Sequence, residues 1–406
     1  MTDWLILADD LTGAADCAIA FAKGGLATAV AWSEAIQGDL PVLSIDVDSR
    51  RLSAEAAAER QVRAQGVHHQ PGARLYKKID STLRGQPAAE LAAQMKALPS
   101  GPAPLAVVAP AFPATGRVTL GGRMMVNGQA LEATPIWARD HTYADGDLAS
   151  ILEGAGLATA LVALDTVRAG IPAVRARMAQ AQAEGKAAVV CDAATEQDLD
   201  TVAAASLALD RVLWVGSAGL AAALARQICP GRTGPPALPA MAGGVLVVVG
   251  SLAEASRLQA AQVVRHGAAQ GMSVSSGTLL AGPRDPAWRA AAADLQARMA
   301  GGADVLLEVA IDDCPDLAQG PALAESLAEL LVAAGPALGA LVATGGETAC
   351  ALLGSLGVHG IELMDEIEPG VPFGLTIGAR RIPVVTKAGG FGDALTLERC
   401  LARLKN

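Results

Sequence analysis

The sequence is poor in aromatic residues, which make up 3% of its 406 residues, and it contains only five histidines. So few histidines leave little material for a zinc site or for a catalytic triad built around histidine. Ala, Leu, Val and Gly predominate instead, as is typical of small-residue helices packed on aliphatic parallel strands. We therefore expect an α/β protein whose chemistry rests on carboxylates and cations.

The sequence also lacks paired cysteines and long apolar runs. No apolar run approaches the ~20 residues that cross a bilayer, and the N-terminus has no leader pattern, so we expect a cytoplasmic protein with no membrane association. The cysteines form no CxxC or Cys/His ligand spacing, which predicts reduced thiols and no metal site. They are Cys17, Cys191, Cys229, Cys314, Cys350 and Cys400.

No basic run long enough to neutralise a nucleic-acid backbone is present, and the net charge is −10. Nucleic acid is therefore excluded as a partner. A hydrophobic content of 52% provides ample surface for a core, and the length suggests two large domains. Oligomeric state is not determined by the sequence, and a homo-oligomer stays open.

Short apolar strands alternate with Ala-rich helical segments along the chain, which predicts βαβ units with mainly parallel sheets. The clearest break is a stretch rich in Pro and Gly at residues 229–244. We predict a first domain at 1–228, a linker at 229–244 and a second domain at 245–406. Predicted strands of the two domains are Leu5–Ala8, Pro41–Asp46, Leu75–Ile79, Leu105–Ala109, Val245–Val249, Ala303–Val309, Gly339–Thr344 and Pro383–Thr386.

Two adjacent carboxylates, Asp9 and Asp10, end the first predicted strand just before a helix. One Asp at that place is explained as a helix N-cap. A second one repels the first, so the pair favours a function such as binding a substrate hydroxyl or accepting its proton.

Dense charge of mixed sign follows the strand Leu75–Ile79, in the run Lys77 to Gly85. Alternation along an extended chain places Lys78, Asp80 and Thr82 on one side. An Arg with a Lys suits a carboxylate or a phosphoryl group, and a solvated surface loop with local ion pairs is the alternative. Arg117 follows the next strand in a turn rich in Pro.

Glycine-rich turns follow three predicted strands of the second domain: Gly250-Ser251, Gly345-Gly346 and Gly389-Gly390. Glycines let backbone N–H groups approach a phosphate at a helix start. One such turn is weak support, because glycines also serve packing, but three favour a nucleotide site. Neither a Walker A motif nor a dinucleotide GxGxxG fingerprint is present.

Taken in order, these motifs resemble the four-carbon acid sugar kinases, formerly a family of unknown function, over nearly the whole chain. The motifs are ADDLTGA at 8–14, KKIDSTLRG at 77–85, APAFPATGR at 109–117, GSAGLA at 216–221, ATGGETA at 343–349, EPGVPFG at 368–374 and TKAGGFGD at 386–393. The resemblance implies an N-terminal sugar-acid domain, a C-terminal nucleotide domain, and ATP-dependent phosphorylation of a four-carbon acid at its terminal hydroxyl. Threonate, erythronate and 3-oxo-tetronate are the acids implied.

The resemblance also suggests site residues. Near the acid it implies Asp9, Asp10, Lys78, Asp80 and Arg84, to which we add Ser81, Arg117 and Arg139. Near ATP it implies Ser251, Gly345, Gly346, Glu347, Thr348, Gly389 and Gly390. The chain departs from the family in carrying Ser256 where members tend to have Thr, and in the segment Thr134–His141, which belongs to the substrate half.

Phosphoryl transfer depends mainly on positioning and electrostatics. We expect Asp10, or failing it Asp9, to orient and deprotonate the hydroxyl, with Lys78 and Arg84 holding the acid's carboxylate or the developing charge. Mg²⁺ would arrive with ATP, and closure about the linker would join the two halves. Two alternatives remain: a dehydrogenase or aldolase of sugar acids, and a sensor that binds without catalysis.

Overall fold

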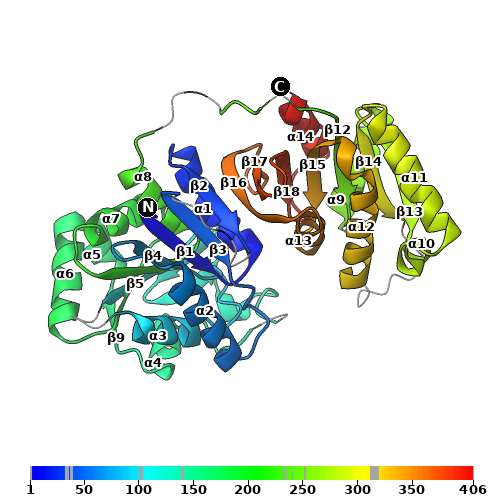
Figure 1. Cartoon of the computed structure of the whole chain (residues 1–406). Helices are drawn as coiled ribbons and strands as arrows, with labels where there is room; N and C mark the ends of the chain where they lie inside the picture. Colours follow the sequence, from blue (N-terminus) through cyan, green and yellow to red (C-terminus); the bar gives the residue numbers. More distant parts are fainter. Residues whose placement is uncertain are drawn as a thin grey trace. The chain divides into compact units, whose positions relative to one another are not determined.

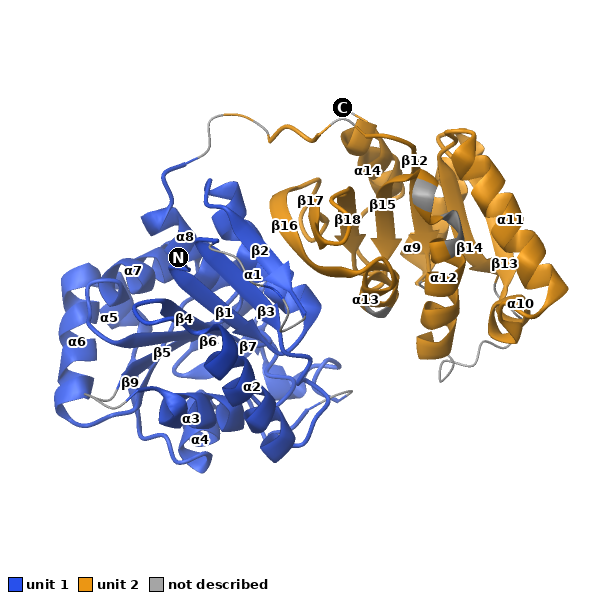
Figure 2. Cartoon of the chain, viewed as in Figure 1, with its two compact units in different colours: residues 1–232 blue, residues 233–406 orange. Residues whose placement is uncertain are grey.

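The computed structural model describes residues 2–32, 36, 40–99, 104–138, 141–231, 234, 236–239, 241–250, 253–310 and 320–405. The chain forms two compact units, residues 1–232 and 233–406 (Figure 2). Both are α/β units with mainly parallel sheets, so the predicted fold class is confirmed. No helix within the described ranges is long and apolar enough to cross a membrane.

The sheet of unit 1 has the order β2-β3-β1-β4-β11-β5-β10-β9, and every neighbouring pair is parallel. The carboxyl ends of these strands therefore share one edge, where ligands of open parallel sheets gather. The four strands predicted in this half correspond to β1, β3, β4 and β5. The bounds are β1 Trp4–Ala8, β2 Thr28–Ala31, β3 Val42–Asp46, β4 Arg74–Lys78, β5 Leu105–Ala109, β9 Thr159–Val162, β10 Ala188–Cys191 and β11 Val212–Gly216.

Helices lie on both faces of this sheet (Figure 1). Helices α1 and α8 pack against each other, and α2 packs against α3. Because side chains alternate along a strand, neighbouring residues of β4 point to different helix layers. The bounds are α1 Leu11–Lys23, α2 Ala54–His68, α3 Pro87–Ala97, α4 Leu148–Gly154, α5 Leu164–Arg168, α6 Ile171–Ala183, α7 Glu196–Ser206 and α8 Ala218–Ile228.

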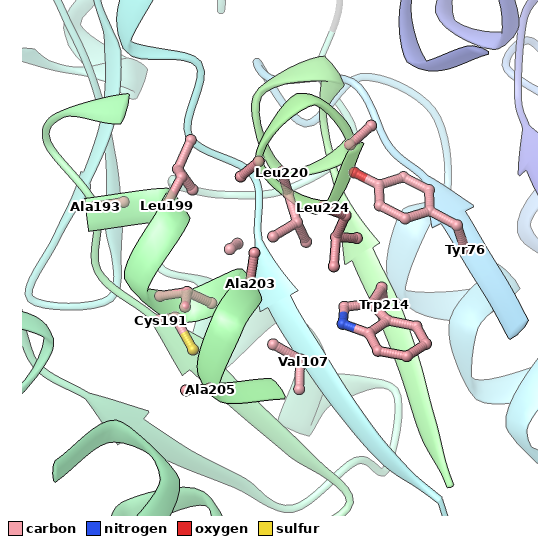
Figure 3. Packing of buried hydrophobic residues seen from close by; sticks show 14 of the residues in the cluster. Tyr76, Val107, Cys191, Ala193, Leu199, Ala203, Ala205, Trp214, Leu220 and Leu224 are labelled. Carbon is pink, nitrogen blue, oxygen red and sulfur yellow. The ribbon is translucent and has the colours of Figure 1, made fainter. Parts of the chain in front are cut away.

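Part of the core of unit 1 lies between the sheet and the helices α7 and α8 (Figure 3). Tyr76 and Trp214 are buried there, and both polar tips are satisfied. The indole N–H of Trp214 donates to Ser206 Oγ at 2.9 Å, and the Tyr76 hydroxyl donates to the Ser217 carbonyl at 2.6 Å. The second bond ties the start of α8 to β4, at the edge where the predicted site residues gather.

A small antiparallel sheet follows β5 and was not predicted. Its strands β6 Arg117–Leu120, β7 Arg123–Val126 and β8 Gln129–Ala130 lie in the order β6-β7-β8. The sequence did contain a hairpin signal, because Asn127-Gly128 is a dipeptide that favours two-residue turns. Both residues have the positive φ such a turn requires, 48° and 81°.

The sheet of unit 2 has the order β13-β14-β12-β15-β18-β17-β16. It is parallel from β13 to β18, but β17 runs antiparallel to both of its neighbours, which was not predicted. The four strands predicted in this half correspond to β12, β14, β15 and β18. The bounds are β12 Gly244–Val249, β13 Gln270–Ser275, β14 Val305–Ala310, β15 Leu338–Thr344, β16 Val358–Glu366, β17 Pro372–Gly378 and β18 Pro383–Lys387.

Helices α9 and α14 pack together over the face of this sheet to which Val245, Val247 and Val249 point. Helices α11, α12 and α13 form a second row in which each contacts the next. The bounds are α9 Glu254–Arg265, α10 Ser276–Ala281, α11 Pro286–Ala300, α12 Gly320–Ala334, α13 Gly346–Ser355 and α14 Thr396–Lys405.

Candidate active site

An arginine that the sequence reading did not select, Arg50, lies at the centre of the unit 1 site. It follows β3, and its guanidinium binds both oxygens of Asp9, with Nε to Oδ2 at 2.8 Å and Nη2 to Oδ1 at 2.9 Å. Its Nη1 binds Asp10 Oδ2 at 2.5 Å, and its Nη2 lies 3.9 Å from Asp80 Oδ1. One side chain, 16% exposed, thus bridges carboxylates that follow two different strands. Nothing in its sequence context, VDSRRLS, distinguishes it from a surface arginine.

Asp9 and Asp10 have different surroundings although they are adjacent. Asp9 is 3% exposed, and its side chain is held on both oxygens by Arg50. Burial alone raises the pKa of Asp9, but the hydrogen bonds and charge of Arg50 and the charge of Lys78 outweigh it, so the pKa lies below its ordinary value.

Asp10 is the N-cap of α1, since its Oδ1 accepts the N–H of Gly13 at 2.9 Å. Its carboxylate is 27% exposed. Helix capping, the explanation expected for one of the two aspartates, therefore applies to Asp10. It does not account for the second oxygen, Oδ2, which binds Arg50. The positive charge of Arg50 offsets the repulsion between the two adjacent carboxylates.

Lys78 lies at the end of β4, against the first turn of α1. A Cβ atom at Gly13 would approach Lys78 Nζ to 2.5 Å, so only glycine lets the ammonium come this close to the helix. Burial lowers the pKa of Lys78, but the charges of Asp9, Asp10 and Asp80 reverse this and raise it above its ordinary value. Lys78 is therefore a permanent cation among three carboxylates.

Asp80 is fixed by its own loop, as the bonds around its side chain show. Its Oδ2 accepts the N–H of Thr82 at 3.0 Å and also the hydroxyl of Thr82. Arg84 binds it in a bidentate manner, with Nε to Oδ2 at 3.0 Å and Nη2 to Oδ1 at 2.8 Å. Burial would raise the pKa of Asp80, but Arg84 and Lys78 hold it far below the ordinary range.

A solvated surface loop with local ion pairs was the alternative prediction for the run Lys77 to Gly85. The burial of this run contradicts that alternative. Lys77, Lys78, Asp80, Ser81 and Thr82 are all 8% exposed or less. Only Arg84 extends outward, with a side chain 38% exposed. A buried loop with this much charge is costly unless its charges are matched. Here Lys77 pairs with Glu90, Asp80 pairs with Arg84, and Lys78 lies in the field of three carboxylates.

Arg117 and Ser81 connect the loops after β5 and β4. Arg117 Nη1 donates to Ser81 Oγ at 3.2 Å, while its Nε is buried without a hydrogen-bond partner. The segment after Trp137 packs on the same region, since the Thr142 hydroxyl donates to the Gly85 carbonyl at 2.7 Å. Arg139, predicted to bind the acid, lies outside the described residues.

A buried polar network supports the loop that carries Arg50. Lys77 points to the α3 side of the sheet and pairs with Glu90 at 2.5 Å, and both side chains are at most 1% exposed. The other oxygen of Glu90 accepts the hydroxyl of Ser49 at 2.6 Å, and Ser49 accepts the side-chain amide of Gln61 at 3.1 Å. Ser49 directly precedes Arg50, so this network helps to set the position of the bridging arginine.

In unit 2 the ends of β12, β15 and β18 meet. The N–H of Gly345, the N-cap of α13, donates to the Lys387 carbonyl at 2.9 Å. Gly250 lies so close to the buried Thr348 that a Cβ atom there would collide with the Thr hydroxyl. Ser251 lies outside the described residues, as does the side chain of Glu347.

The loop with Gly389 and Gly390 is held from two sides. The hydroxyl of Ser256, on α9, donates to the Gly389 carbonyl at 2.7 Å, so the Ser that replaces the family's Thr still supplies a hydroxyl to this loop. On the C-terminal side of the loop, Arg399 on α14 donates to Asp393 Oδ1 at 2.7 Å, and its Nε donates to Glu368 at 3.0 Å. The three glycine turns are therefore assembled at one edge of the unit 2 sheet.

Comparisons with known proteins match the two halves of the chain separately and the chain as a whole. A family model described as a sugar-binding N-terminal domain matches residues 4–224, and one described as a nucleotide-binding C-terminal domain matches residues 246–397. A D-threonate kinase of Cupriavidus necator is 45% identical over 97% of this chain and 96% of its own length. A D-threonate kinase of Bordetella bronchiseptica is 37% identical over 98% of this chain and 97% of its own.

The chain belongs to the four-carbon acid sugar kinase family. This kinase also shares its fold with a crystal structure of a Haemophilus influenzae protein, at a TM-score of 0.86 and 22% identity, covering 99% of this chain and 100% of the other. The predicted family, fold class and enzyme class are thus confirmed.

One further carboxylate of the kinase, Asp46 at the end of β3, joins the cluster. Its Oδ1 accepts the N–H of Asp48 at 2.8 Å. Burial raises the pKa of Asp46 to about 7, against a lowering by that hydrogen bond, and the charges of Asp10, Asp48 and Asp9 add to the rise. The sequence reading ended the strand at Asp46 and gave this residue no role.

The raised pKa of Asp46 predicts a pH-dependent cost to folding. Because the folded pKa lies above the ordinary 3.8, the cost is absent below about pH 4 and complete above about pH 7. Asp46→Asn keeps an oxygen for the Asp48 N–H and removes the charge. We expect the variant to be more stable than wild type at about pH 8, by at most roughly 4 kcal/mol at ~1.4 kcal/mol per pH unit, and equal to it at about pH 4.

Urea unfolding of both proteins at the two pH values measures this difference. The neighbouring exposed Asp48→Asn is the control and should show little pH-dependent gain. An Asp46→Asn difference that is the same at both pH values would contradict the assignment.

Proposed function

We propose that this kinase transfers the γ-phosphoryl group of ATP, bound as its Mg²⁺ complex, to the terminal C4 hydroxyl of a four-carbon acid sugar, and that D-threonate is its preferred acceptor. The observation that carries the proposal is the bridging of Asp9 and Asp10 by Arg50. In this arrangement the Asp10 carboxylate is partly exposed, while the neighbouring Asp9 carboxylate is buried. The choice of D-threonate is supported by the 45% identity to a D-threonate kinase.

In this mechanism Asp10 orients the acceptor hydroxyl and takes its proton as the oxygen attacks the γ-phosphorus. The bond from phosphorus to the β–γ bridging oxygen breaks, and ADP leaves with that oxygen. Asp9 is not proposed as the base, because its pKa is lowered and its side chain is buried, whereas the Asp10 carboxylate is partly exposed. Its proposed role is to anchor Arg50.

The carboxylate of the acid is proposed to bind Arg84 and Arg117. Arg84 uses Nε and Nη2 for Asp80, which leaves the Nη1 end of its partly exposed side chain for a ligand. Arg117 has a buried Nε without a partner. Planar guanidinium groups suit carboxylates, and Ser81 lies beside them. Lys78 is too enclosed to hold the acid and is proposed to balance the charge of the carboxylates instead.

ATP is proposed to bind unit 2 with its phosphates at the turns Gly345-Gly346 and Gly389-Gly390, near Thr348, with Ser251 and Glu347 as further ligands. The start of α13 has no side-chain cap, so its first N–H groups are available to phosphate oxygens. Mg²⁺ would neutralise phosphate charge during transfer.

An ADP-release assay across D-threonate, L-threonate, D-erythronate, L-erythronate and 3-oxo-tetronate tests the proposal. We expect D-threonate to give the highest kcat/KM, by about 10-fold or more, because a site built on hydrogen bonds discriminates strongly between hydroxyl arrangements. Phosphorus NMR of the product should show a phosphomonoester on C4.

D-Threitol, in which a CH2OH group replaces the carboxylate and the remaining hydroxyls are the same, is the matched control. Its kcat/KM should fall by about 100-fold or more, because Arg84 and Arg117 would lose their charged partner. A better acceptor among the other acids would overturn the choice of D-threonate, and an absence of turnover with every acid would overturn the function itself.

A further inference from the structure

Lys387, the last residue of β18, is a buried cation for which the described residues provide no ion-pair partner. Its side chain is 3% exposed. The ammonium donates to Ser256 Oγ at 3.1 Å and lies 3.5 Å from the Gly389 carbonyl, and both partners are neutral. Within the described ranges, no carboxylate forms an ion pair with it. It was not among the ATP ligands predicted from the sequence.

Three other buried cations of the described residues lie beside carboxylates. Lys77 pairs with Glu90 at 2.5 Å, Arg50 binds Asp9 through two bonds, and Lys78 lies in the field of Asp9, Asp10 and Asp80. An unpaired buried charge is costly, and proteins normally keep one only where a partner is supplied. The exception of Lys387 therefore points to a negative charge that comes from outside the chain.

A second unsatisfied group lies next to Lys387. Thr344 is its register partner on β15, and Val249 is the partner of Thr344 on β12, so the three side chains form a row on one face of the sheet. Thr344 is fully buried, and its hydroxyl has no hydrogen-bond partner. Among the described residues, the cation at this carboxyl edge has no counter-ion and the hydroxyl has no hydrogen-bond partner, and both suit the oxygen atoms of a phosphate group.

The glycine turns lie directly beside these groups. Gly345 follows Thr344 and bonds to the Lys387 carbonyl, while Gly389 accepts the Ser256 hydroxyl that also touches Lys387. We propose that Lys387 binds a phosphate group of ATP, which supplies its missing counter-ion, and that the Thr344 hydroxyl donates to the same phosphate. This inference rests on the proposed nucleotide site of unit 2 but not on the identity of the acid.

Proton uptake should accompany the binding. In the free protein burial lowers the pKa of Lys387, and the charge of Glu368 after β16 compensates only in part. The Cys400 thiol is neutral, because burial raises its pKa to about 12, and Glu368 is engaged by Arg399. The group of α9 that accepts the hydrogen bond from the Lys387 ammonium is the Ser256 hydroxyl, which is neutral. A bound phosphate raises the pKa of Lys387 again, so ATP binds with uptake of a proton when the solution pH exceeds the lowered value.

Calorimetric titration of the full chain with MgATP tests the inference, using wild type, Lys387→Met and Lys387→Arg. For Lys387→Met we expect the Kd of ATP to rise on the order of 10- to 100-fold, the effect of losing a charged hydrogen bond. The midpoint of thermal unfolding without ATP should stay unchanged or rise, because an unpaired buried charge is gone. The exposed Lys96→Met, on unit 1, is the control and should change neither.

Lys387→Arg keeps the charge but cannot lose its proton. We expect it to retain ATP affinity better than Lys387→Met. In titrations at several pH values up to about 10, just below the ordinary pKa of lysine, in two buffers of different ionisation enthalpy, the proton uptake of wild type should grow with pH, and Lys387→Arg should show no such growth.

A Lys387→Met variant whose Kd for ATP lies within twofold of the wild-type value would overturn the inference. A Lys387→Arg variant with the same proton uptake as wild type would also overturn it. If Lys387→Met does not fold, the proton uptake of Lys387→Arg decides alone. The wild-type protein could bind ATP with this proton uptake and still phosphorylate no acid. That result would support the inference about Lys387 and would contradict the proposed function.

Discussion

Replacing Asp10 by Asn is expected to lower kcat by about 10²- to 10⁴-fold, the usual contribution of a positioned general base. Asn caps a helix as well as Asp does, so the bond from the Gly13 N–H and the stability of α1 should survive. Because the nucleotide is proposed to bind unit 2, the Kd of ATP should stay within about twofold of wild type.

Asp10→Ala separates the two roles of this residue. It loses the cap as well as the charge, so it should lower the free energy of unfolding by about 1 kcal/mol, whereas Asp10→Asn should change it little. Both variants should lose turnover equally. Single-turnover measurements with saturating ATP report the chemical step directly. An Asp10→Asn enzyme with unchanged turnover would remove Asp10 from the role and direct attention to Asp9.

Replacing Arg50 by Met should have the second large effect. It leaves Asp9, Asp10 and Asp80 clustered without the cation that bridges them. Removing one partner of a buried ion pair costs about 3–5 kcal/mol, and we expect a loss of stability of that order. The kcat/KM for the acid should fall by about 10³-fold or more, because Asp9 and Asp10 would repel each other and lose their fixed geometry.

The loss of stability should depend on pH in a defined direction. The pKa of Asp9 is lowered in the folded protein, so its ion pair stabilises wild type above the unfolded pKa of about 3.9 and ceases to do so as pH falls through the lower folded value. The gap between wild type and Arg50→Met should therefore narrow in acid. Chemical unfolding at about pH 7 and about pH 3 measures it.

Arg50→Lys and Arg51→Met are the controls. Lys provides one point charge and cannot bind both oxygens of Asp9 and also Asp10, so Arg50→Lys should recover only part of the activity. Arg51 is the neighbouring exposed arginine, and its replacement should leave kcat/KM within about threefold. An Arg50→Met enzyme with normal stability and activity would mean that the bridge between the carboxylates is not needed.

Local sequence was enough to predict the α/β class, because alternation of apolar strands with Ala-rich helices is a short-range pattern. It was not enough for β6 to β8 or for the antiparallel β17, whose pairing depends on turns and on partners distant along the chain. The motif residues Asp9, Asp10, Lys78 and Asp80 were selected because unusual charge at the end of a strand is visible in the sequence.

The sequence by itself determined which loops carry chemistry: the charged ends of β1 and β4 and the glycine turns of unit 2. Only the tertiary structure showed that Arg50 unites those charges, that Lys77 belongs to a buried support with Glu90, and that Lys387 is left without a counter-ion among the described residues. The physical reason is that a charge acquires its role from what surrounds it within a few ångströms. Those neighbours come from strands that are adjacent in the sheet but far apart in the chain.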